Sequence, residues 1–305
     1  MPVWRTLPHL LEMIRFSHTL FALPFALFAA IMAWATPLPS GEPPAFHPLH
    51  LAGILVCMVC GRSAAMAFNR LADRHLDAAN PRTAGRHLPA GILPVATVAG
   101  FTALAAAGFV AGTLLFLPNR LPLYLSPPAL VFLFAYSYTK RFTWLAHFWL
   151  GAALMLAPLG AWVALRGRQL LSDPADALPA IVLGIGVLLW VAGFDMIYAC
   201  QDASHDRRAK LHSVPARWGV ARALRVAAAC HTGMVLALAA LPFTSPQLAL
   251  GPIYGTAVAT VALLLVYEHR IVRPDDLSRV NLAFFHLNWM VSMGLLVLGA
   301  VDLLL

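Results

Sequence analysis

Residues 178–206 read LPAIVLGIGVLLWVAGFDMIYACQDASHD, an apolar run that turns acidic at its end. Its first part, Leu178–Cys200, is long enough for a helix to cross the ~30 Å hydrocarbon core of a bilayer. An isolated strand in lipid would leave its backbone groups unpaired, so the run must be helical. The whole chain has this character, with 60% hydrophobic residues, 11% charged residues and a mean hydropathy of +0.76. The sequence predicts an all-α polytopic membrane protein and excludes a water-soluble globule.

Apolar runs of this kind recur along all 305 residues and leave no room for a sizeable soluble domain. We therefore expect residues 1–305 to form a single membrane domain. Polar segments at 69–77 and 198–206 give it the pattern of two related halves. The expected bundle has nine transmembrane helices, at Phe16–Ala35, Leu51–Phe68, Ile92–Leu117, Leu121–Tyr136, Trp144–Leu165, Leu178–Cys200, Val226–Phe243, Leu250–Tyr267 and Leu282–Val301.

Basic residues are distributed unevenly between the two ends of these segments. Short cytoplasmic loops collect Lys and Arg, and a cytoplasmic N-terminus puts 17 of the 21 basic residues on that side, with Arg166 among the few outside. Eight or ten helices would spoil this partition, so we expect nine helices and a cytoplasmic N-terminus. Anionic membrane lipids account for the basic face and for the pI near 9.9, so the charge does not indicate nucleic-acid binding.

Two smaller features fit a membrane protein as well. Residues 2–14 have amphipathic spacing, which predicts a helix lying at the interface. The cysteines lie in or beside apolar helices, and Cys57 and Cys60 form a C-x-x-C inside a span without nearby histidine ligands. Packing explains them better than metal or redox chemistry.

Five of the ten aspartates lie in or beside the two polar segments. Asp73 and Asp77 are four residues apart, and so are Asp202 and Asp206, so each pair would stack on one face of a helix that continues out of the membrane. Asn69 extends the first stripe by one turn. One such pair beside arginine could be a salt-bridged helix end, but two matched pairs on one membrane face indicate a site.

Carboxylates at this spacing repel each other, and the cost rises at a membrane boundary where water is scarce. Mg²⁺ would compensate them, because it prefers hard oxygen ligands and binds through carboxylates together with substrate phosphates. The arginines that follow each pair would neutralise the remaining phosphate oxygens. The pattern therefore predicts a site for Mg²⁺ and a diphosphate.

Both segments resemble motifs of the UbiA superfamily of intramembrane aromatic prenyltransferases. NRLADRHLD at 69–77 and the loop RTAGRHLPAG at 82–91 resemble the first motif and its continuation, and Y-x-x-x-D-x-x-x-D at 198–206 resembles the second. YSYTKRFT at 136–143 extends a resemblance that covers nearly the whole chain. The 4-hydroxybenzoate polyprenyltransferase group and the prenyltransferases of the futalosine route to menaquinone are most similar, and the sequence does not separate them.

The resemblance implies transfer of a polyprenyl chain from polyprenyl diphosphate to a ring carbon of a small aromatic acid, either 4-hydroxybenzoate or a dihydroxynaphthoate, in ubiquinone or menaquinone biosynthesis. It also implies a prokaryotic-type inner membrane with the active site on the cytoplasmic side. Two positions depart from the family: Arg70 stands where an acid is common, so it is not counted as a metal ligand, and His212 replaces an expected Lys. The implied roles are Mg²⁺ and diphosphate binding by Asn69, Asp73, Asp77, Asp202 and Asp206, and diphosphate neutralisation by Arg82, Arg86, Lys140, Arg141 and Arg208. Beside these, we expect acceptor binding by Arg62, Arg15 and Tyr198 and catalysis by Asp195, Asp73 and Asp202.

Several alternatives remain open. Asp195 would accept a phenol proton, stabilise the allylic cation, or make a structural hydrogen bond. Arg62 lies two helical turns before Asn69, where an unpaired cation is costly, and would bind the acceptor carboxylate or pair with Asp195. The chain could instead prenylate haem or another lipophilic acceptor, or be a secondary transporter. Transporters place their sites near the midplane on broken helices, whereas these acids lie at helix ends.

Overall fold

The computed structural model describes residues 3–14, 21–38 and 41–305. This part is helical and contains no strand, only an isolated β-bridge between Arg273 and Asp276. Seven of its helices are long and apolar enough to cross a membrane. They run over Pro48–Ala79, Val95–Phe116, Leu121–Thr139, Ala146–Ser172, Pro174–Arg208, Val220–Phe243 and Val280–Leu304. The prediction of an all-α membrane protein is confirmed.

Two of the nine expected segments are not among these seven. In the first, helix α2 (Leu23–Ala35) has 13 residues, and the beginning of the expected segment lies outside the described residues. In the eighth, helix α11 (Pro252–Ile271) has 20 residues, about 30 Å at 1.5 Å per residue, but Glu268 and Arg270 make its end polar. The count of nine and the cytoplasmic N-terminus stay predictions.

Packing divides the chain into two compact units, each described here by itself. The first unit combines the described part of residues 1–19 with Leu51–Tyr138 and contains the first acidic motif. The second combines the described part of residues 20–50 with Thr139–Leu305 and contains the second motif. The single domain over 1–305 stays a prediction.

The first unit is built around one long helix, α3. Its elements are α1 (Val3–Met13), α3 (Pro48–Ala79), α4 (Val95–Gly112), the 3₁₀ turn η2 (Thr113–Phe116) and α5 (Leu121–Thr139). The apolar side of α1 supplies Leu10 and Met13 to a buried cluster with Ala67 of α3 and Val98 of α4. The amphipathic N-terminal segment is thus helical, as predicted, and its apolar face packs on the helices beside it.

Small residues bring α3 and α4 close together. A Cβ added to Gly108 would lie 2.9 Å from the Sγ of Cys60, and one added to Gly112 would lie 3.0 Å from the Sγ of Cys57. The Cys57 thiol also lies 3.6 Å from the Phe109 carbonyl oxygen. Both cysteines are free thiols. Their contacts support the packing role, since small residues let membrane helices approach closely.

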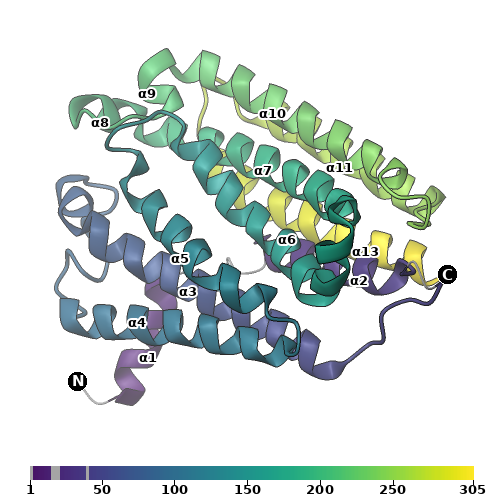
Figure 1. Ribbon diagram of the computed structural model, residues 1–305. Coiled ribbons are helices and arrows are strands. Elements are labelled where there is room, and N and C mark those ends of the chain that lie inside the picture. The colour runs from purple at the N-terminus through teal and green to yellow at the C-terminus, as the bar shows by residue number, and fades with distance from the viewer. Residues whose placement is uncertain (1–2, 15–20, 39–40) are drawn as a thin grey trace. The chain divides into compact units, whose positions relative to one another are not determined.

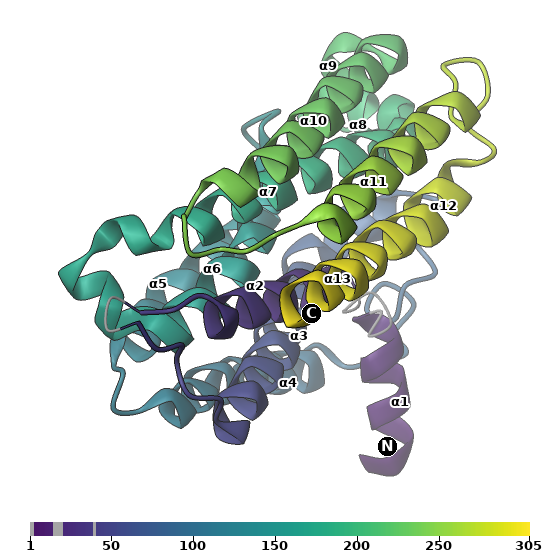
Figure 2. The same cartoon turned by 90° about the vertical axis from the view of Figure 1, so that its right-hand side faces the viewer.

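In the second unit, α7 is the central helix. Figure 1 shows it between α6 and α10, while Figure 2 shows α11 beside α10 and α13. Trp190 of α7 is fully buried and donates its Nε1–H to Asn288 Oδ1 of α13 at 2.7 Å. The bounds are α6 (Ala146–Ser172), η3 (Pro174–Ala177), α7 (Leu178–Ala199), η4 (Cys200–Asp202), α8 (Ala203–Arg208), α9 (Val214–Trp218), α10 (Val220–Ala240), η5 (Leu241–Phe243), α12 (Val280–Leu282), a π-helical turn (Ala283–Leu287) and α13 (Asn288–Leu304).

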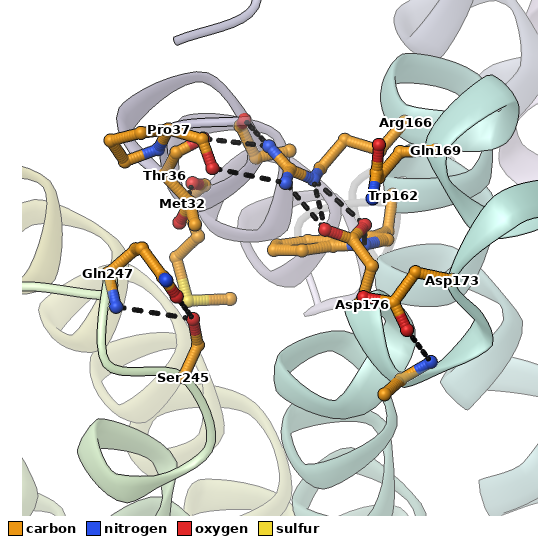
Figure 3. A network of polar contacts seen from close by, with 12 residues as sticks. Met32, Thr36, Pro37, Trp162, Arg166, Gln169, Asp173, Asp176, Ser245 and Gln247 are labelled. Atoms are coloured by element: carbon orange, nitrogen blue, oxygen red, sulfur yellow. Dashed lines mark hydrogen bonds and ion pairs between the residues drawn. The ribbon is translucent and has the colours of Figure 1, made fainter. Parts of the chain in front are cut away.

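One placement differs from the expectation for the fifth span. The expected segment ended at Leu165, with Arg166 in an outer loop, but α6 continues to Ser172 and Arg166 is only 3% exposed. Its Nη1 donates to the Thr36 carbonyl oxygen at 2.7 Å and its Nε to Asp176 Oδ2 at 2.9 Å (Figure 3). Asp176 therefore neutralises the guanidinium inside the protein, and the guanidinium also donates to carbonyl oxygens at the end of α2, where a helix leaves its last carbonyls without internal donors.

Replacing Arg166 by Met is expected to lower the free energy of unfolding by about 3–5 kcal/mol, because it leaves the buried Asp176 carboxylate without its cation. Thermal unfolding in detergent measures the change. Arg168→Met is the matched control, since Arg168 lies two residues away on the same helix but is exposed. Equal stability of the two variants would contradict a stabilising role for the buried pair.

Candidate active site

The first acidic motif occupies the polar end of α3. As expected, the helix continues unbroken to Ala79. Asn69 donates from Nδ2 to Asp73 Oδ2 at 2.9 Å and to the Ser137 Oγ of α5 at 3.4 Å. Both hydrogen bonds use the amide nitrogen, so Asn69 Oδ1 is the side-chain atom that can coordinate a metal ion. The stripe therefore presents oxygen atoms that can coordinate a metal ion on one face of the helix.

Asp77, one turn further, lies between two guanidinium groups. Arg86 Nη1 donates to its Oδ1 at 2.7 Å, and Arg70 Nη1 lies 3.7 Å from its Oδ2. Asp77 is buried, and within the described residues its Oδ2 accepts no hydrogen bond. Thr83 closes the following loop by donating from Oγ1 to the Asp77 carbonyl at 2.9 Å. Arg70, the departure from the family pattern, thus supplies charge compensation to Asp77.

The loop after α3 carries the two arginines assigned to the diphosphate. Arg86 is half-buried and points to Asp77, whereas Arg82 is exposed. Both lie within the first unit, near the Asp73–Asp77 stripe in sequence. The structure therefore brings Arg86 into direct contact with the acidic motif.

The second motif lies in the span Pro174–Arg208 but is not one continuous α-helix. The chain was expected to continue as a helix through Tyr198, Asp202 and Asp206, but α7 ends at Ala199 and a 3₁₀ turn precedes α8. Asp202 is half-buried at the junction, and Asp206 is 5% exposed in the first turn of α8. The 3₁₀ turn spans Cys200–Asp202, so Asp202 lies at its last residue and Asp206 in the helix that follows.

Ser213 fixes the orientation of Asp206. Its Oγ donates to Asp206 Oδ2 at 2.9 Å and accepts from the Ala216 N–H at 3.3 Å, which makes Ser213 the N-cap of α9. Ser213 is itself fully buried. A buried carboxylate with one oxygen held by a hydroxyl has a defined direction for its second oxygen, as a metal ligand requires.

The remaining basic candidates of the second unit lie on loops near this motif in sequence. Lys140 is half-buried, and its carbonyl oxygen accepts from the His212 N–H at 2.7 Å, which joins the loop after α5 to the loop after α8. Arg141 and Arg208 are exposed. Tyr198 is partly buried and packs against the core of the unit.

Asp195 has a partner that the sequence did not reveal. Its Oδ2 lies 2.6 Å from Nδ1 of His147, the second residue of α6, and His147 is fully buried. The Val214 N–H donates to His147 Nε2 at 3.3 Å. The sequence contains only an indirect signal, because a carboxylate inside an apolar helix needs a partner. His147 is a polar residue near the start of the preceding expected span, Trp144–Leu165.

The acceptor candidates are only partly described. Arg62 is half-buried in α3, and its Nε has no hydrogen-bond partner within the described ranges. Asp195, the alternative partner considered for Arg62, is engaged by His147. Arg15 lies outside the described residues. An unsatisfied buried guanidinium nitrogen is costly unless a ligand group completes it.

The oxygen-rich side chains suit Mg²⁺. Carboxylate and amide oxygens are the hard ligands that this ion prefers, and the buried Asp77 Oδ2 accepts no hydrogen bond within the described part of the chain. Neither motif offers a Cys or His ligand cluster of the kind that selects zinc. The donor set therefore fits a hard divalent cation together with a phosphate-bearing substrate.

Comparison with known proteins agrees with this chemistry. The model of the UbiA prenyltransferase family matches residues 17–290. The chain is 31% identical over 240 residues to the 4-hydroxybenzoate octaprenyltransferase of Nitrosospira multiformis, covering 77% of this chain and 78% of that one. It is 31% identical over 257 residues to the protein of the same name from Marinobacter nauticus, covering 84% of this chain and 82% of that one.

Two solved structures share the fold. The apo structure of a UbiA homolog from Aeropyrum pernix K1 superposes with a TM-score of 0.81 at 31% identity and covers 94% of this chain and 98% of that one. A UbiA homolog from Archaeoglobus fulgidus bound to GPP and Mg²⁺ has a TM-score of 0.71 at 16% identity and covers 97% and 100%. The chain therefore belongs to the UbiA prenyltransferase family and is a membrane prenyltransferase.

Proposed function

We propose that this prenyltransferase joins a polyprenyl chain to a ring carbon of a small aromatic acid, of the 4-hydroxybenzoate or dihydroxynaphthoate type, in the biosynthesis of ubiquinone or menaquinone. The observation that carries the proposal is the Asn69–Asp73–Asp77 stripe at the end of a membrane helix, with Arg86 on Asp77. The names of the curated relatives support 4-hydroxybenzoate as the first acceptor to test. The basic loops favour an active site on the cytoplasmic side of an inner membrane.

The residues of the two motifs would bind the leaving group. Asn69, Asp73, Asp77, Asp202 and Asp206 would hold Mg²⁺, which when bound draws electron density from the diphosphate oxygens. Arg82, Arg86, Lys140, Arg141 and Arg208 would neutralise the charge that the diphosphate gains as it leaves.

Breaking the allylic C–O bond releases diphosphate and leaves a carbocation spread over three carbons. A ring carbon of the acceptor attacks this cation, forms the new C–C bond and then loses its proton. The helices exclude water that would otherwise trap the cation. Asp195 would lower the barrier as an anion beside the reacting groups or as the acceptor of the phenol proton.

The decisive experiment is an acceptor screen. Purified protein in detergent receives a polyprenyl diphosphate, Mg²⁺ and one acceptor, and the release of diphosphate and the prenylated product are both measured. We expect turnover with 4-hydroxybenzoate or with a dihydroxynaphthoate, and none in the presence of excess chelator. No turnover with any aromatic acid would contradict the proposal, and turnover with haem alone would assign the chain to the other acceptor class. Family membership already favours a transferase over the transporter alternative.

Arg62→Met is expected to raise the KM for the aromatic acid by roughly 10²-fold, about 3 kcal/mol, because it removes a charge-assisted bond to the acceptor carboxylate. The KM for the polyprenyl diphosphate should change little. Arg62→Lys separates charge from geometry, since Lys keeps the charge but not the planar fork. An unchanged acceptor KM in Arg62→Met would remove Arg62 from the acceptor site.

A further inference from the structure

We propose that His147 is a positioning residue that holds Asp195 in place through a fixed tautomer, and that the start of α9 ties this pair to Asp206. The inference rests on the proposed function, because it assigns a role to a residue that the prenyl transfer would need. All of its residues lie in the second unit, and the sequence motifs did not indicate His147 or Val214.

The first step is the tautomer of His147. A backbone N–H can only donate, so the Val214 N–H at 3.3 Å requires an unprotonated Nε2. The ring proton then lies on Nδ1, which faces Asp195 Oδ2 at 2.6 Å. His147 therefore donates to Asp195, and the carboxylate remains the acceptor of this pair.

The second step is the rigidity of the pair. His147 is fully buried at the beginning of α6, and Asp195 sits on α7, the most buried span. With both ring nitrogens engaged, the imidazole cannot rotate without losing a bond in a buried place. Asp195 Oδ2 is thereby fixed, and its other oxygen has a constant direction.

The third step is the link to the second motif. Val214 is the first residue of α9 and follows Ser213, whose hydroxyl donates to Asp206 Oδ2 at 2.9 Å. Two consecutive residues thus hold the two carboxylates, Ser213 directly and Val214 through His147. Any displacement of this short helix start would move both together. The arrangement couples the carboxylate assigned to the leaving group with the carboxylate assigned to the acceptor.

The test uses substitutions that keep or remove the two bonds. The side-chain amide of Gln carries an accepting oxygen and a donating nitrogen on one carbon, about as far apart as the two imidazole nitrogens. In His147→Gln the oxygen can accept from the Val214 N–H and the nitrogen can donate to Asp195. His147→Leu can do neither. His147→Met is a second apolar variant if Leu does not fold. His286→Leu, an exposed histidine of the same unit, is the control.

We expect His147→Leu to lower kcat roughly 10²-fold, as loss of an orienting partner commonly does, with the KM for polyprenyl diphosphate within about twofold. His147→Gln should recover most of kcat. The double variant His147→Leu/Asp195→Asn should be no slower than Asp195→Asn alone, because His147 acts only through Asp195.

Three outcomes would overturn the inference in a folded, active protein: wild-type kcat in His147→Leu, equal loss in the Gln and Leu variants, or independent, multiplicative losses in the double variant. A wild-type protein without turnover would instead refute the proposed function. In that case thermal unfolding of the single and double variants at positions 147 and 195 tests the contact. The shifts of the unfolding midpoint should be non-additive, and additive shifts would contradict a contact between His147 and Asp195.

Discussion

Replacing Asp73 by Asn is expected to lower kcat/KM for the polyprenyl diphosphate by roughly 10³-fold, about 4 kcal/mol of transition-state stabilisation. The substitution removes one negative charge but keeps a side-chain oxygen. That oxygen can still accept from Asn69 Nδ2, which lies 2.9 Å from Asp73 Oδ2 in the wild-type protein. The helix end is therefore expected to stay folded, and the loss should fall on ion and diphosphate binding.

The measurement is turnover as a function of Mg²⁺ concentration. Asp73→Asn should need a higher Mg²⁺ concentration for half-maximal rate, because one hard ligand is weakened. Arg74→Ala is the control, since Arg74 is the next residue, is exposed and bonds only to the Leu71 carbonyl within α3 in the described structure. Full activity of Asp73→Asn would refute the metal assignment of the first motif.

Much of the architecture could be predicted because lipid leaves the backbone few choices. Apolar runs of about 20 residues must be helical, and the first acidic pair lies on an unbroken helix as its four-residue spacing predicts. The family motifs indicated which acidic segments carry the site, and the region that the family model matches includes both of them.

Long-range pairs could not be predicted in the same way. His147 meets Asp195 across 48 residues and Val214 across 67, and nothing local marks a histidine in an apolar helix as the partner of a distant acid. The expected span ends at Leu165 and leaves Arg166 in an outer loop, yet Asp176 neutralises Arg166 inside the protein and the Thr36 carbonyl oxygen accepts from it. An ionisable residue inside an apolar span indicates that a partner is needed, but only the tertiary structure identifies that partner.

The second motif shows a further limit. Four-residue spacing is compatible with a continuous helix, but a 3₁₀ turn at Cys200–Asp202 interrupts it. Asp206 Oδ2 accepts from the Ser213 hydroxyl, a contact that the spacing of the aspartates did not predict. Such a break leaves no clear trace in the sequence, because Cys, Gln and Asp also occur in ordinary helix ends.

Asp206→Asn is expected to reduce kcat/KM by an amount similar to that of Asp73→Asn, roughly 10³-fold, while thermal stability stays near that of the wild type. The Asn carbonyl oxygen can still accept from Ser213, so the N-cap of α9 survives and only the charge is lost. Asp275→Asn is the control, because Asp275 pairs with Arg273 on an exposed loop.

Combining Asp73→Asn with Asp206→Asn distinguishes one functional assembly from two independent ones. If both carboxylates serve the same Mg²⁺–diphosphate, removing the second after the first should cost far less than another 10³-fold, as residues that act as a unit are strongly non-additive. Multiplicative losses would mean that the two motifs contribute to separate steps. Ser213→Ala tests orientation separately, because it keeps the charge of Asp206 but removes its hydroxyl donor and the N-cap of α9. The lost cap should lower the free energy of unfolding by about 1 kcal/mol. A fall in kcat/KM of the folded variant would show that the orientation of Asp206 matters as well as its charge.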